Sequence, residues 1–578
     1  MVLITIIRKD KMQNLKSNIA KKLAETIGAD SFDATYTDVL TSLEYPPDST
    51  MGDLALPCFK FAKVMRKSPV MIAEELASSL KIEGIEKIEA VKGYLNFFIS
   101  NDYLAKVLLP EILEKKDMYG SSDEGKGKTV VLDYSSPNVA KPFHIGHLGT
   151  TVIGHSLKLL HTFCGYDCVG INHLGDWGTQ FGKLITAFNL WGNKETIENG
   201  GIDALVALYV KFHEEAEKDA SLNDRAREEF HKLELGDEKN TELWKWFIEI
   251  SITEYKKTYT QLGIEFDSYK GEAFYSDKMM PEVEKIREKG LLKIDDGASI
   301  VDLSDYNMPP CLILKRDGST LYPTRDIAAA VYRKATYDFD KVIYVTSAGQ
   351  SLHFAQWFKV VELMGYDWAK DLVHVPYGTV SIGGAKLATR TGNVILLRDL
   401  FASAIDKVKE IIDEKSPDLE NKEETAEAVG VGAIVFYYLL NTIIKDINFN
   451  MEDALSFEGN TGPYAQYTYA RTCSLLSKAN VSENCEMKIT APEEASMLKV
   501  LSRFPETVLR ATHEYEPSSI TRYILDICTA FNRFYHSCPI NSAEDENVRA
   551  SRIKITEATN HVLGRALSLI CLKTPRKI

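Results

Sequence analysis

The stretch from residue 130 to residue 151, VVLDYSSPNVAKPFHIGHLGTT, constrains the fold more than any other part of this chain. It opens with a β-branched apolar run, Val130 to Leu132, which is typical of a buried parallel strand. A polar loop with two prolines follows, and from His144 apolar residues recur at helical steps. In α/β sheets a strand, a loop and a helix N-terminus bind phosphates in this order, because free N–H groups and the helix dipole face the anion. The stretch therefore predicts a nucleotide-binding α/β core.

The predicted helix starts with His144, Ile145, Gly146 and His147. Gly146 lets a flat ring approach the backbone, and the two histidines share one face, where both can donate to phosphate oxygens. A pair of capping or core histidines has the same spacing, and no third ligand at a recognisable spacing indicates a metal site. The surrounding sequence favours the phosphate-binding interpretation.

That stretch resembles the HIGH signature of class I aminoacyl-tRNA synthetases, and SPNVAKPFHIGH is similar to arginyl-tRNA synthetases in particular. Three later segments carry the same resemblance: HLGDWGTQFG at 173–182, LYPTRD at 321–326 and AGQSLH at 348–353. The resemblance covers most of the chain. It implies an α/β Rossmann-like nucleotide-binding core with a helical insertion, an α+β N-terminal domain and an all-α C-terminal bundle.

Three domains are expected along the chain. Residues 1–122 are predicted to form the α+β module, in which Leu95, Phe97 and Ile99 alternate as on a strand. Residues 123–401 are predicted to form the catalytic domain, with a charged, mostly helical insertion at about 190–290. The remainder, 402–578, reads as a helical bundle. The resemblance implies that the first domain contacts the outer corner of a tRNA and that the last binds its anticodon.

Charge and cysteine content narrow the class of protein. The net charge of −14 speaks against nucleic-acid binding over the whole surface, but a local basic patch is enough for phosphate contacts. The sequence contains no run of 18 apolar residues, so it predicts no membrane span. Its first apolar run is too short for a signal peptide. Nine cysteines without a CxxC pair argue against a disulfide framework and a zinc ribbon. We therefore expect a cytoplasmic protein without membrane segments.

The resemblance also implies an arginine-binding set. Its members come from the Ser-Pro-Asn loop, the second signature histidine and later loops: Ser136, Pro137, Asn138, His147, Glu272, Tyr322, Asp326 and Gln350. Asp326 supplies an acid that suits a guanidinium. A helix-start acid is the alternative explanation for that carboxylate.

Residues 374–400 occupy the place of the family's KMSKS signature, aligned as Lys386-Leu387-Ala388-Thr389-Arg390. Thr389 stands where the signature has its second lysine, so we expect Lys141 to supply the missing charge; a surface lysine in a loop is the alternative. The expected ATP-binding residues are His144, Gly146, His147 and Lys386, and the expected catalytic residues are His144, His147, Lys141, Lys386 and Arg390. Magnesium accompanies ATP as a family expectation, and no residue pattern predicts a metal site.

The C-terminal region interleaves aromatic and basic side chains at Tyr464, Tyr467 and Arg471. Such side chains can stack on tRNA bases, although tyrosines in a helical core are the commoner case. The resemblance implies ATP-dependent activation of L-arginine and its transfer to tRNA(Arg), with activation dependent on bound tRNA. We also expect the protein to be a monomer. Two alternatives stay open: a class I synthetase for another amino acid, and a non-catalytic tRNA-binding paralogue.

Overall fold

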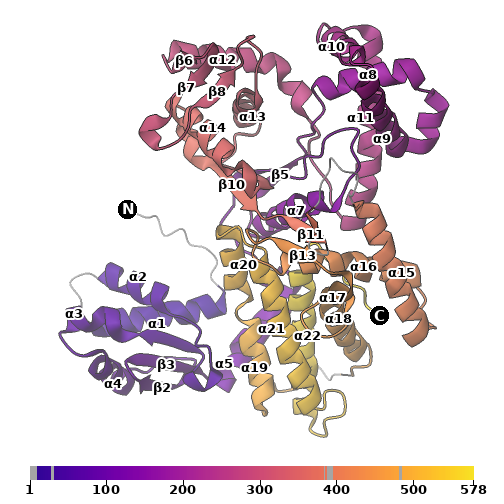
Figure 1. Ribbon diagram of the computed structural model, residues 1–578. Helices are drawn as coiled ribbons and strands as arrows, with labels where there is room; N and C mark the ends of the chain where they lie inside the picture. Colours follow the sequence, from indigo (N-terminus) through magenta and orange to yellow (C-terminus); the bar gives the residue numbers. More distant parts are fainter. Residues whose placement is uncertain (1–9, 28–31, 383–384, 387–394, 481–484) are drawn as a thin grey trace.

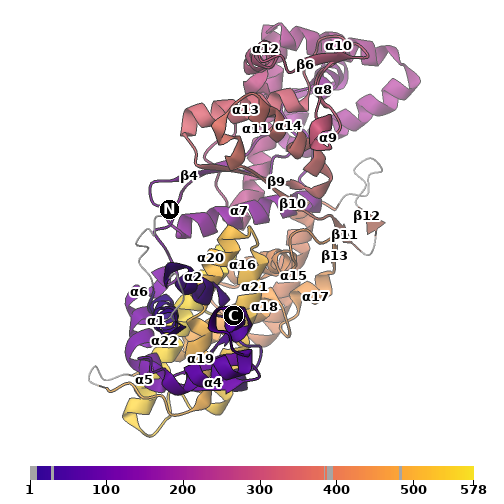
Figure 2. The same cartoon turned by 90° about the vertical axis from the view of Figure 1, so that its left-hand side faces the viewer.

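The computed structural model describes residues 10–27, 32–382, 385–386, 395–480 and 485–578. In Figure 1 the N-terminal domain lies beside the helices of the C-terminal region, and the central sheet with its helical insertion lies beyond both. Figure 2 shows the same arrangement turned by 90°, with the strands of that sheet on one side of helix α7 and the C-terminal helices on the other. The predicted fold class, a parallel-sheet core with a separate N-terminal domain and a helical C-terminal region, is confirmed.

The N-terminal domain is built on an antiparallel sheet in the order β1-β3-β2. Leu95, Phe97 and Ile99 of β3 are buried, so the predicted alternating strand is confirmed. Helix α1 packs through a buried apolar stripe that includes Leu15 and Ile19. The elements are α1 (Lys11–Ile27), α2 (Phe32–Ser42), β1 (Leu54–Pro57), α3 (Ala62–Met65), α4 (Pro69–Ser79), β2 (Ile85–Val91), β3 (Tyr94–Ile99), α5 (Asn101–Tyr103) and α6 (Leu109–Lys115).

The central region holds a four-stranded parallel sheet in the order β10-β9-β4-β5. Residues 130–132 in its middle strand β4 are fully buried, as their apolar run predicts. All four strands run in the same direction, so the loops after them open at one edge, where such sheets bind ligands. The elements are β4 (Thr129–Asp133), η5 (Ile145–His147), α7 (Leu148–Phe163), β5 (Asp167–Ile171), β9 (Lys341–Ser347), η8 (Ala348–Gln350), α14 (Ser351–Leu363) and β10 (Leu372–Tyr377).

Between β5 and β9 the chain leaves this sheet. The charged segment predicted to be helical forms α9 to α11, and a small antiparallel sheet in the order β6-β7-β8 follows it. Tyr322 follows β8 of the antiparallel sheet, not a strand of the parallel sheet, and begins α13. The elements are α8 (Thr179–Trp191), α9 (Lys194–Lys218), α10 (Ser221–Glu234), α11 (Glu238–Leu262), η6 (Glu272–Lys278), α12 (Met279–Glu288), β6 (Leu292–Asp295), β7 (Ala298–Val301), β8 (Cys311–Leu314) and α13 (Tyr322–Tyr337).

The C-terminal region is helical apart from a small sheet in the order β12-β11-β13. Its longest apolar run forms α16, in which residues 428–436 are all buried. Among the described residues no helix is long and apolar enough to cross a membrane. The elements are β11 (Val380–Ile382), β12 (Ala385–Lys386), α15 (Leu397–Lys415), α16 (Lys422–Leu439), β13 (Ile447–Phe449), α17 (Met451–Leu455), α18 (Gly462–Ser477), α19 (Pro492–Leu501), α20 (Phe504–His513), α21 (Ser518–Ser537) and α22 (Glu546–Leu569).

Polar contacts dock the N-terminal domain on the C-terminal helices. The buried Lys16 lies 2.6 Å from Glu506 of α20, whose carboxylate also accepts a hydrogen bond from the Tyr45 hydroxyl at 2.9 Å. Lys499 of α19 lies 2.9 Å from Asp53. Because one partner of each ion pair is buried, separating the two regions would leave charges in an apolar surrounding. These contacts hold the two regions in one orientation.

Candidate active site

The two histidines of the HIGH segment lie at the helix start, as predicted, and cap it. Nδ1 of His144 accepts a hydrogen bond from the N–H of Gly146 at 3.1 Å, and Nδ1 of His147 accepts one from the N–H of His144 at 3.2 Å. The two ring centroids lie 3.9 Å apart. Since each Nδ1 is an acceptor, the proton of each neutral ring is on Nε2. Both rings therefore offer one N–H donor, whereas the amide of Gly146 is already engaged.

Both rings are neutral at physiological pH. Burial, and after it the charge of Lys141, lower the pKa of His144 to about 4. Burial also lowers the pKa of His147 to about 3, with further contributions from His144 and Lys141. The histidines can thus orient phosphate oxygens by hydrogen bonding, but they do not neutralise phosphate charge. A cation has to come from elsewhere in the site.

The Ser-Pro-Asn loop has a constrained backbone. Ser135 and Ser136 have φ values of 71° and 46°, in the left-handed region that few side chains other than glycine adopt. The hydroxyl of Ser135 lies 2.7 Å from the Tyr259 hydroxyl of α11. The Ser136 N–H donates to Asn172 at 3.2 Å, and its hydroxyl donates to Asp133 at 3.0 Å. Partners from β4, from the loop after β5 and from α11 thus impose the conformation of the loop.

The loop after β5 lies directly against Pro137 and Asn138. The N–H of Gly175 donates to the carbonyl of Pro137 at 3.1 Å, and a Cβ at Gly175 would lie 2.1 Å from Oδ1 of Asn138. Only glycine fits there. The hydroxyl of Tyr255 lies 2.8 Å from the carbonyl oxygens of both Asn138 and Lys141. The HLGDWG segment therefore supports the loop that carries the predicted arginine-binding residues.

Two predicted acids lie at the carboxyl edge of the sheet, and each has a partner. Glu272, at the start of η6, lies 2.9 Å from the guanidinium of Arg325 in α13. Asp326, the next residue of α13, lies 2.6 Å from Nε2 of His353 in α14. The two carboxylates therefore come from different elements and meet around the first turn of α13.

A third carboxylate, which the sequence did not suggest, belongs to the same group. Asp176 accepts a hydrogen bond from the N–H of Ala273 at 2.8 Å, next to Glu272. Burial raises the pKa of Asp176 to about 6. Burial raises the pKa of Glu272 to about 7, because the opposing effect of Arg325 does not outweigh it and the neighbouring carboxylates add to it. Such an excess of buried acids suits a cationic ligand.

Tyr322 and Gln350 lie at the open rim. The side chain of Tyr322 is 67% exposed, and Gln350 at the end of η8 is exposed as well. The Tyr322 ring centroid lies 5.8 Å from the guanidinium carbon of Arg325. The structure thus brings Tyr322, Glu272 and Asp326 together around the first turn of α13, and Gln350 directly precedes the helix α14 that carries His353, the partner of Asp326.

A buried ion pair beneath the site was also missed by sequence reasoning. Asp133 at the end of β4 lies 2.7 Å from Arg333 of α13, whose side chain is 1% exposed. Arg333 also approaches Nδ1 of His173 at 3.3 Å and the Tyr344 ring at 5.5 Å. The available signal was an acid directly after a buried strand and an arginine in the otherwise apolar helix segment IAAAVYR. Pairing them required the tertiary structure.

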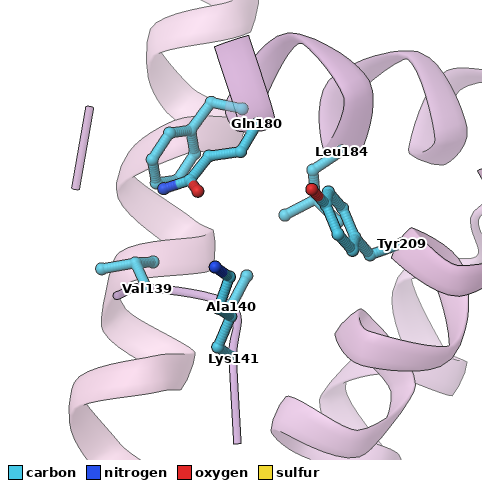
Figure 3. A pocket seen from close by; sticks show the side chains of 7 residues that line it. Val139, Ala140, Lys141, Gln180, Leu184 and Tyr209 are labelled. Carbon is cyan, nitrogen blue, oxygen red and sulfur yellow. The ribbon is translucent and has the colours of Figure 1, made fainter. Parts of the chain in front are cut away.

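Lys141 lies in the loop before the first histidine. It lines a small cavity, and Figure 3 shows its side chain extending into that cavity toward Gln180. Lys141 is exposed, yet its charge reaches both signature histidines, since it contributes to the low pKa of each. The remaining lining residues come from the loop itself and from helices α8 and α9: Val139, Ala140, Phe181, Leu184 and Tyr209.

The KMSKS-like segment is described only in part. The backbone of Lys386 belongs to β12, which pairs with β11, whereas Thr389 and the predicted catalytic Arg390 lie outside the described residues. Within the same 374–400 stretch, Leu396 forms a β-bridge with His144, and the N–H of Ile145 donates to the carbonyl of residue 395 at 3.2 Å. The two signature segments therefore adjoin at the helix start.

The predicted tRNA-contacting residues gather on one face of α18 and α21. The guanidinium of Arg471 lies 4.9 Å from the ring centroids of both Tyr467 and Tyr535, and it donates to Asn532 at 2.9 Å. Asn532 in turn donates to the Tyr464 hydroxyl at 2.6 Å. Tyr467 and Tyr535 are 40% and 37% exposed, so the face presents aromatic rings and one guanidinium to the solvent. Tyr535 and Asn532 are members that the sequence did not reveal.

No group of three histidine, cysteine or carboxylate side chains in the described part of the chain could hold a metal ion. The site as described thus offers hydrogen-bond donors to an anion, a constrained loop and a cluster of carboxylates. These features suit a nucleotide and a cationic small molecule bound side by side at the sheet edge.

Three family models match the chain. They are the class I (R) tRNA synthetase catalytic domain over residues 108–451, the arginyl tRNA synthetase N-terminal domain over 13–99 and the DALR anticodon-binding domain over 465–578. Among curated proteins, an arginine–tRNA ligase of Alkaliphilus metalliredigens is 50% identical over 97% of this chain and 100% of its own length. One of Clostridioides difficile is 50% identical over 98% of this chain and 100% of its own length.

Solved structures share the fold. The arginyl-tRNA synthetase of Thermus thermophilus superposes with a TM-score of 0.82 at 24% identity, covering 97% of this chain and 99% of its own. That of Plasmodium falciparum gives a TM-score of 0.80 at 23% identity, covering 98% of each chain. The likeness extends over all three regions of the molecule.

Proposed function

The chain belongs to the arginyl-tRNA synthetase family of class I, and from this premise we propose how its residues carry out the reaction. Its activity is that of an arginine–tRNA ligase: ATP and L-arginine form arginyl-adenylate and pyrophosphate, and arginine then passes to the terminal ribose of tRNA(Arg). Family membership argues against a synthetase for another amino acid. An aminoacylation assay, described below, tests the remaining alternative of a non-catalytic paralogue.

The chemistry requires positioning and charge stabilisation. The carboxylate of arginine attacks the α-phosphorus of ATP and pyrophosphate leaves; a ribose hydroxyl then attacks the acyl carbon and AMP leaves. The protein contributes orientation and donors to oxygens that gain charge in the transition state. The Nε2–H donors of His144 and His147 serve the phosphates, and Gly146 leaves room for the adenine. Lys141, Lys386 and Arg390 supply the positive charge.

Arginine lies across the carboxyl edge of the sheet. Ser136, Pro137, Asn138 and His147 hold its backbone end. Its guanidinium lies between the carboxylates of the pocket, where a planar group with five donors meets acceptors on two sides. The carboxylate-rich surroundings of Glu272 and Asp326 support this placement. Tyr322 and Gln350, exposed at the rim, complete the pocket around the side chain.

The remaining partners are the metal ion that accompanies ATP and the tRNA. ATP brings Mg²⁺ with it as part of the substrate, as expected for this family. The tRNA is contacted by residues 1–122 at its outer corner and by Tyr464, Tyr467 and Arg471 in residues 402–578, with catalysis in residues 123–401. The protein acts as a monomer in the cytoplasm; its nine cysteines are free, as is usual in a reducing compartment.

A single comparison carries the proposal: 50% identity over 97% of the chain to an arginine–tRNA ligase, with both signature histidines in place. The test is aminoacylation of tRNA(Arg) by the purified protein with ATP and each of arginine, lysine and citrulline. We expect charging with arginine alone. A folded protein that binds tRNA and charges it with no amino acid would show the non-catalytic alternative to be right.

A further inference from the structure

An arginine of the chain itself lies in the acidic pocket. Arg325 and Asp326 are neighbours in the first turn of α13, and the guanidinium of Arg325 lies 2.9 Å from a carboxylate oxygen of Glu272. The side chains of Arg325 and Glu272 are 13% and 17% exposed. The guanidinium also lies 5.8 Å from the Tyr322 ring centroid, within the range of a cation–π contact. Arg325 is thus the immediate partner of one of the acids expected to bind the substrate.

We propose that Arg325 is a positioning residue for arginine recognition: it keeps the Glu272 carboxylate charged and oriented, so that Glu272 and Asp326 both face the substrate guanidinium. This inference rests on the proposed arginine subsite. In this arrangement Arg325 does not itself touch the reacting atoms. It acts through Glu272.

The charges around Glu272 explain why such a partner is needed. Asp176, from the loop after β5, and Asp326, from α13, are like charges near Glu272 and disfavour its ionised form. Asp326 is itself paired with His353 of α14. Arg325 is the cation that lowers the pKa of Glu272, with which it forms an ion pair. Burial and the two carboxylates would otherwise favour the protonated acid, which accepts fewer hydrogen bonds.

A backbone hydrogen bond fixes the position of Glu272 relative to the loop that carries Asp176. The N–H of Glu272 donates to the carbonyl of Leu174 at 3.0 Å, so η6 begins directly against the loop that carries Asp176. Arg325 meets Glu272 through a terminal nitrogen, and its Nε, which is buried, has no hydrogen-bond partner within the described residues. A lysine at this position would keep the charge but lose the planar fork. We therefore expect a lysine to restore the protonation behaviour of Glu272 only in part.

The experiment measures kcat/KM for arginine in aminoacylation between pH 6 and pH 9, because this ratio reports the ionisation of groups in the free enzyme. Burial raises the pKa of Glu272 to about 7 in the presence of Arg325. Loss of a neighbouring opposite charge moves such a pKa upward by about 1–3 pH units. In Arg325→Gln we expect kcat/KM to fall about 10- to 100-fold at pH 7 and to recover toward the wild-type value at pH 9. Arg325→Lys should lie in between, with the KM for ATP unchanged in both.

Arg316→Gln is the matched control, because Arg316 forms an exposed ion pair with Asp296 away from the pocket. It should behave as wild type at every pH. A loss in Arg325→Gln that is equal at pH 7 and pH 9, or no loss at all, would overturn the inference. If the glutamine variant fails to fold, Arg325→Lys keeps the test decisive. A folded lysine variant with a raised KM for arginine but the pH profile of the wild type would also overturn the inference.

Two further variants separate this inference from the proposed arginine subsite. Glu272→Gln should lower kcat/KM for arginine at all pH values, and adding Arg325→Gln to it should cause no further pH-dependent loss. If neither Glu272→Gln nor Asp326→Asn changes arginine kinetics, the subsite assignment itself is wrong. If both do, and Arg325→Gln shows no pH-dependent loss, only the role of Arg325 is wrong.

Discussion

The carboxylate of Asp133 lies 2.7 Å from the guanidinium of Arg333, and this buried pair joins the end of strand β4 to helix α13. Strand β4 leads into the loop that carries Ser136 and Asn138. Helix α13 carries Asp326. The pair therefore sets the distance between the two halves of the proposed arginine site, one for the backbone end of the substrate and one for its guanidinium.

Arg333→Met should destabilise the protein strongly, because it leaves Asp133 buried without its cation. Removing one partner of a buried ion pair costs about 3–5 kcal/mol. Urea unfolding followed by circular dichroism measures the change. The double variant Asp133→Asn with Arg333→Met should lose less than Arg333→Met alone, since no unpaired charge remains. A loss below about 1 kcal/mol in Arg333→Met would contradict the role given to the pair.

Asp326→Asn should raise the KM for arginine about 100-fold and leave the KM for ATP near the wild-type value. A carboxylate that faces a guanidinium makes charge-assisted hydrogen bonds, each worth about 1.5–3 kcal/mol, and an amide cannot replace them. Such a site rejects lysine and citrulline without an editing step. Steady-state aminoacylation kinetics measure both constants. Unchanged arginine kinetics would show that another acid binds the guanidinium.

Lys141→Ala should lower the rate of adenylate formation by about 10- to 1,000-fold, the range for loss of one oriented donor. The reason is that the histidines are neutral and Thr389 brings no charge to the signature segment. Single-turnover formation of arginyl-adenylate measures the rate. Thr389→Lys in the same background should recover part of the loss. A native rate in Lys141→Ala would assign the charge to Lys386 or Arg390 alone.

Arginine activation should require bound tRNA. The C-terminal helices follow the KMSKS-like segment directly, and Leu396 of that segment bridges to His144. Binding energy from tRNA on those helices can thus be used to order the active site. Pyrophosphate exchange with ATP and arginine, measured with and without tRNA(Arg), checks this. Equal exchange rates under both conditions would refute the coupling.

The stability of the protein should fall below pH 6.5 because of buried neutral histidines. His155 approaches the Tyr134 hydroxyl at 3.2 Å, and burial lowers its pKa to about 4. In the unfolded chain the His155 ring takes up a proton near pH 6.5. Between about pH 6.5 and pH 4 the unfolded chain therefore binds more protons than the folded chain, and the stability falls as the pH drops through that window.

His155→Gln removes this contribution. The difference in the free energy of unfolding between pH 7.5 and pH 5 should therefore shrink by about 2 kcal/mol relative to wild type. Urea titrations at the two pH values measure it. His231→Gln is the control, because the His231 side chain is 69% exposed. An unchanged difference in His155→Gln would show that the ring is protonated in the folded protein.

Much of the fold could be predicted from local patterns. The apolar run 130–132 forms the central strand, and the histidines cap the helix that follows, because a strand, a loop and a helix start are encoded by neighbouring residues. The alternation at Leu95, Phe97 and Ile99 predicted a strand for the same reason. The sheet to which the strand before Tyr322 belongs could not be predicted, since a short apolar run does not specify its partner strand.

By itself, the sequence determined the family, through the resemblance of its motifs, and the order of the regions and the residue types available at the sheet edge, since these depend on which residues stand where along the chain. Only the tertiary structure decided how the charges are paired: Asp133 with Arg333, and Glu272 with Arg325. These partners are distant in the chain and meet because β4, η6 and α13 pack together at one edge of the sheet. Their burial then sets which groups carry charge, because desolvation and neighbouring charges act through space and not along the sequence.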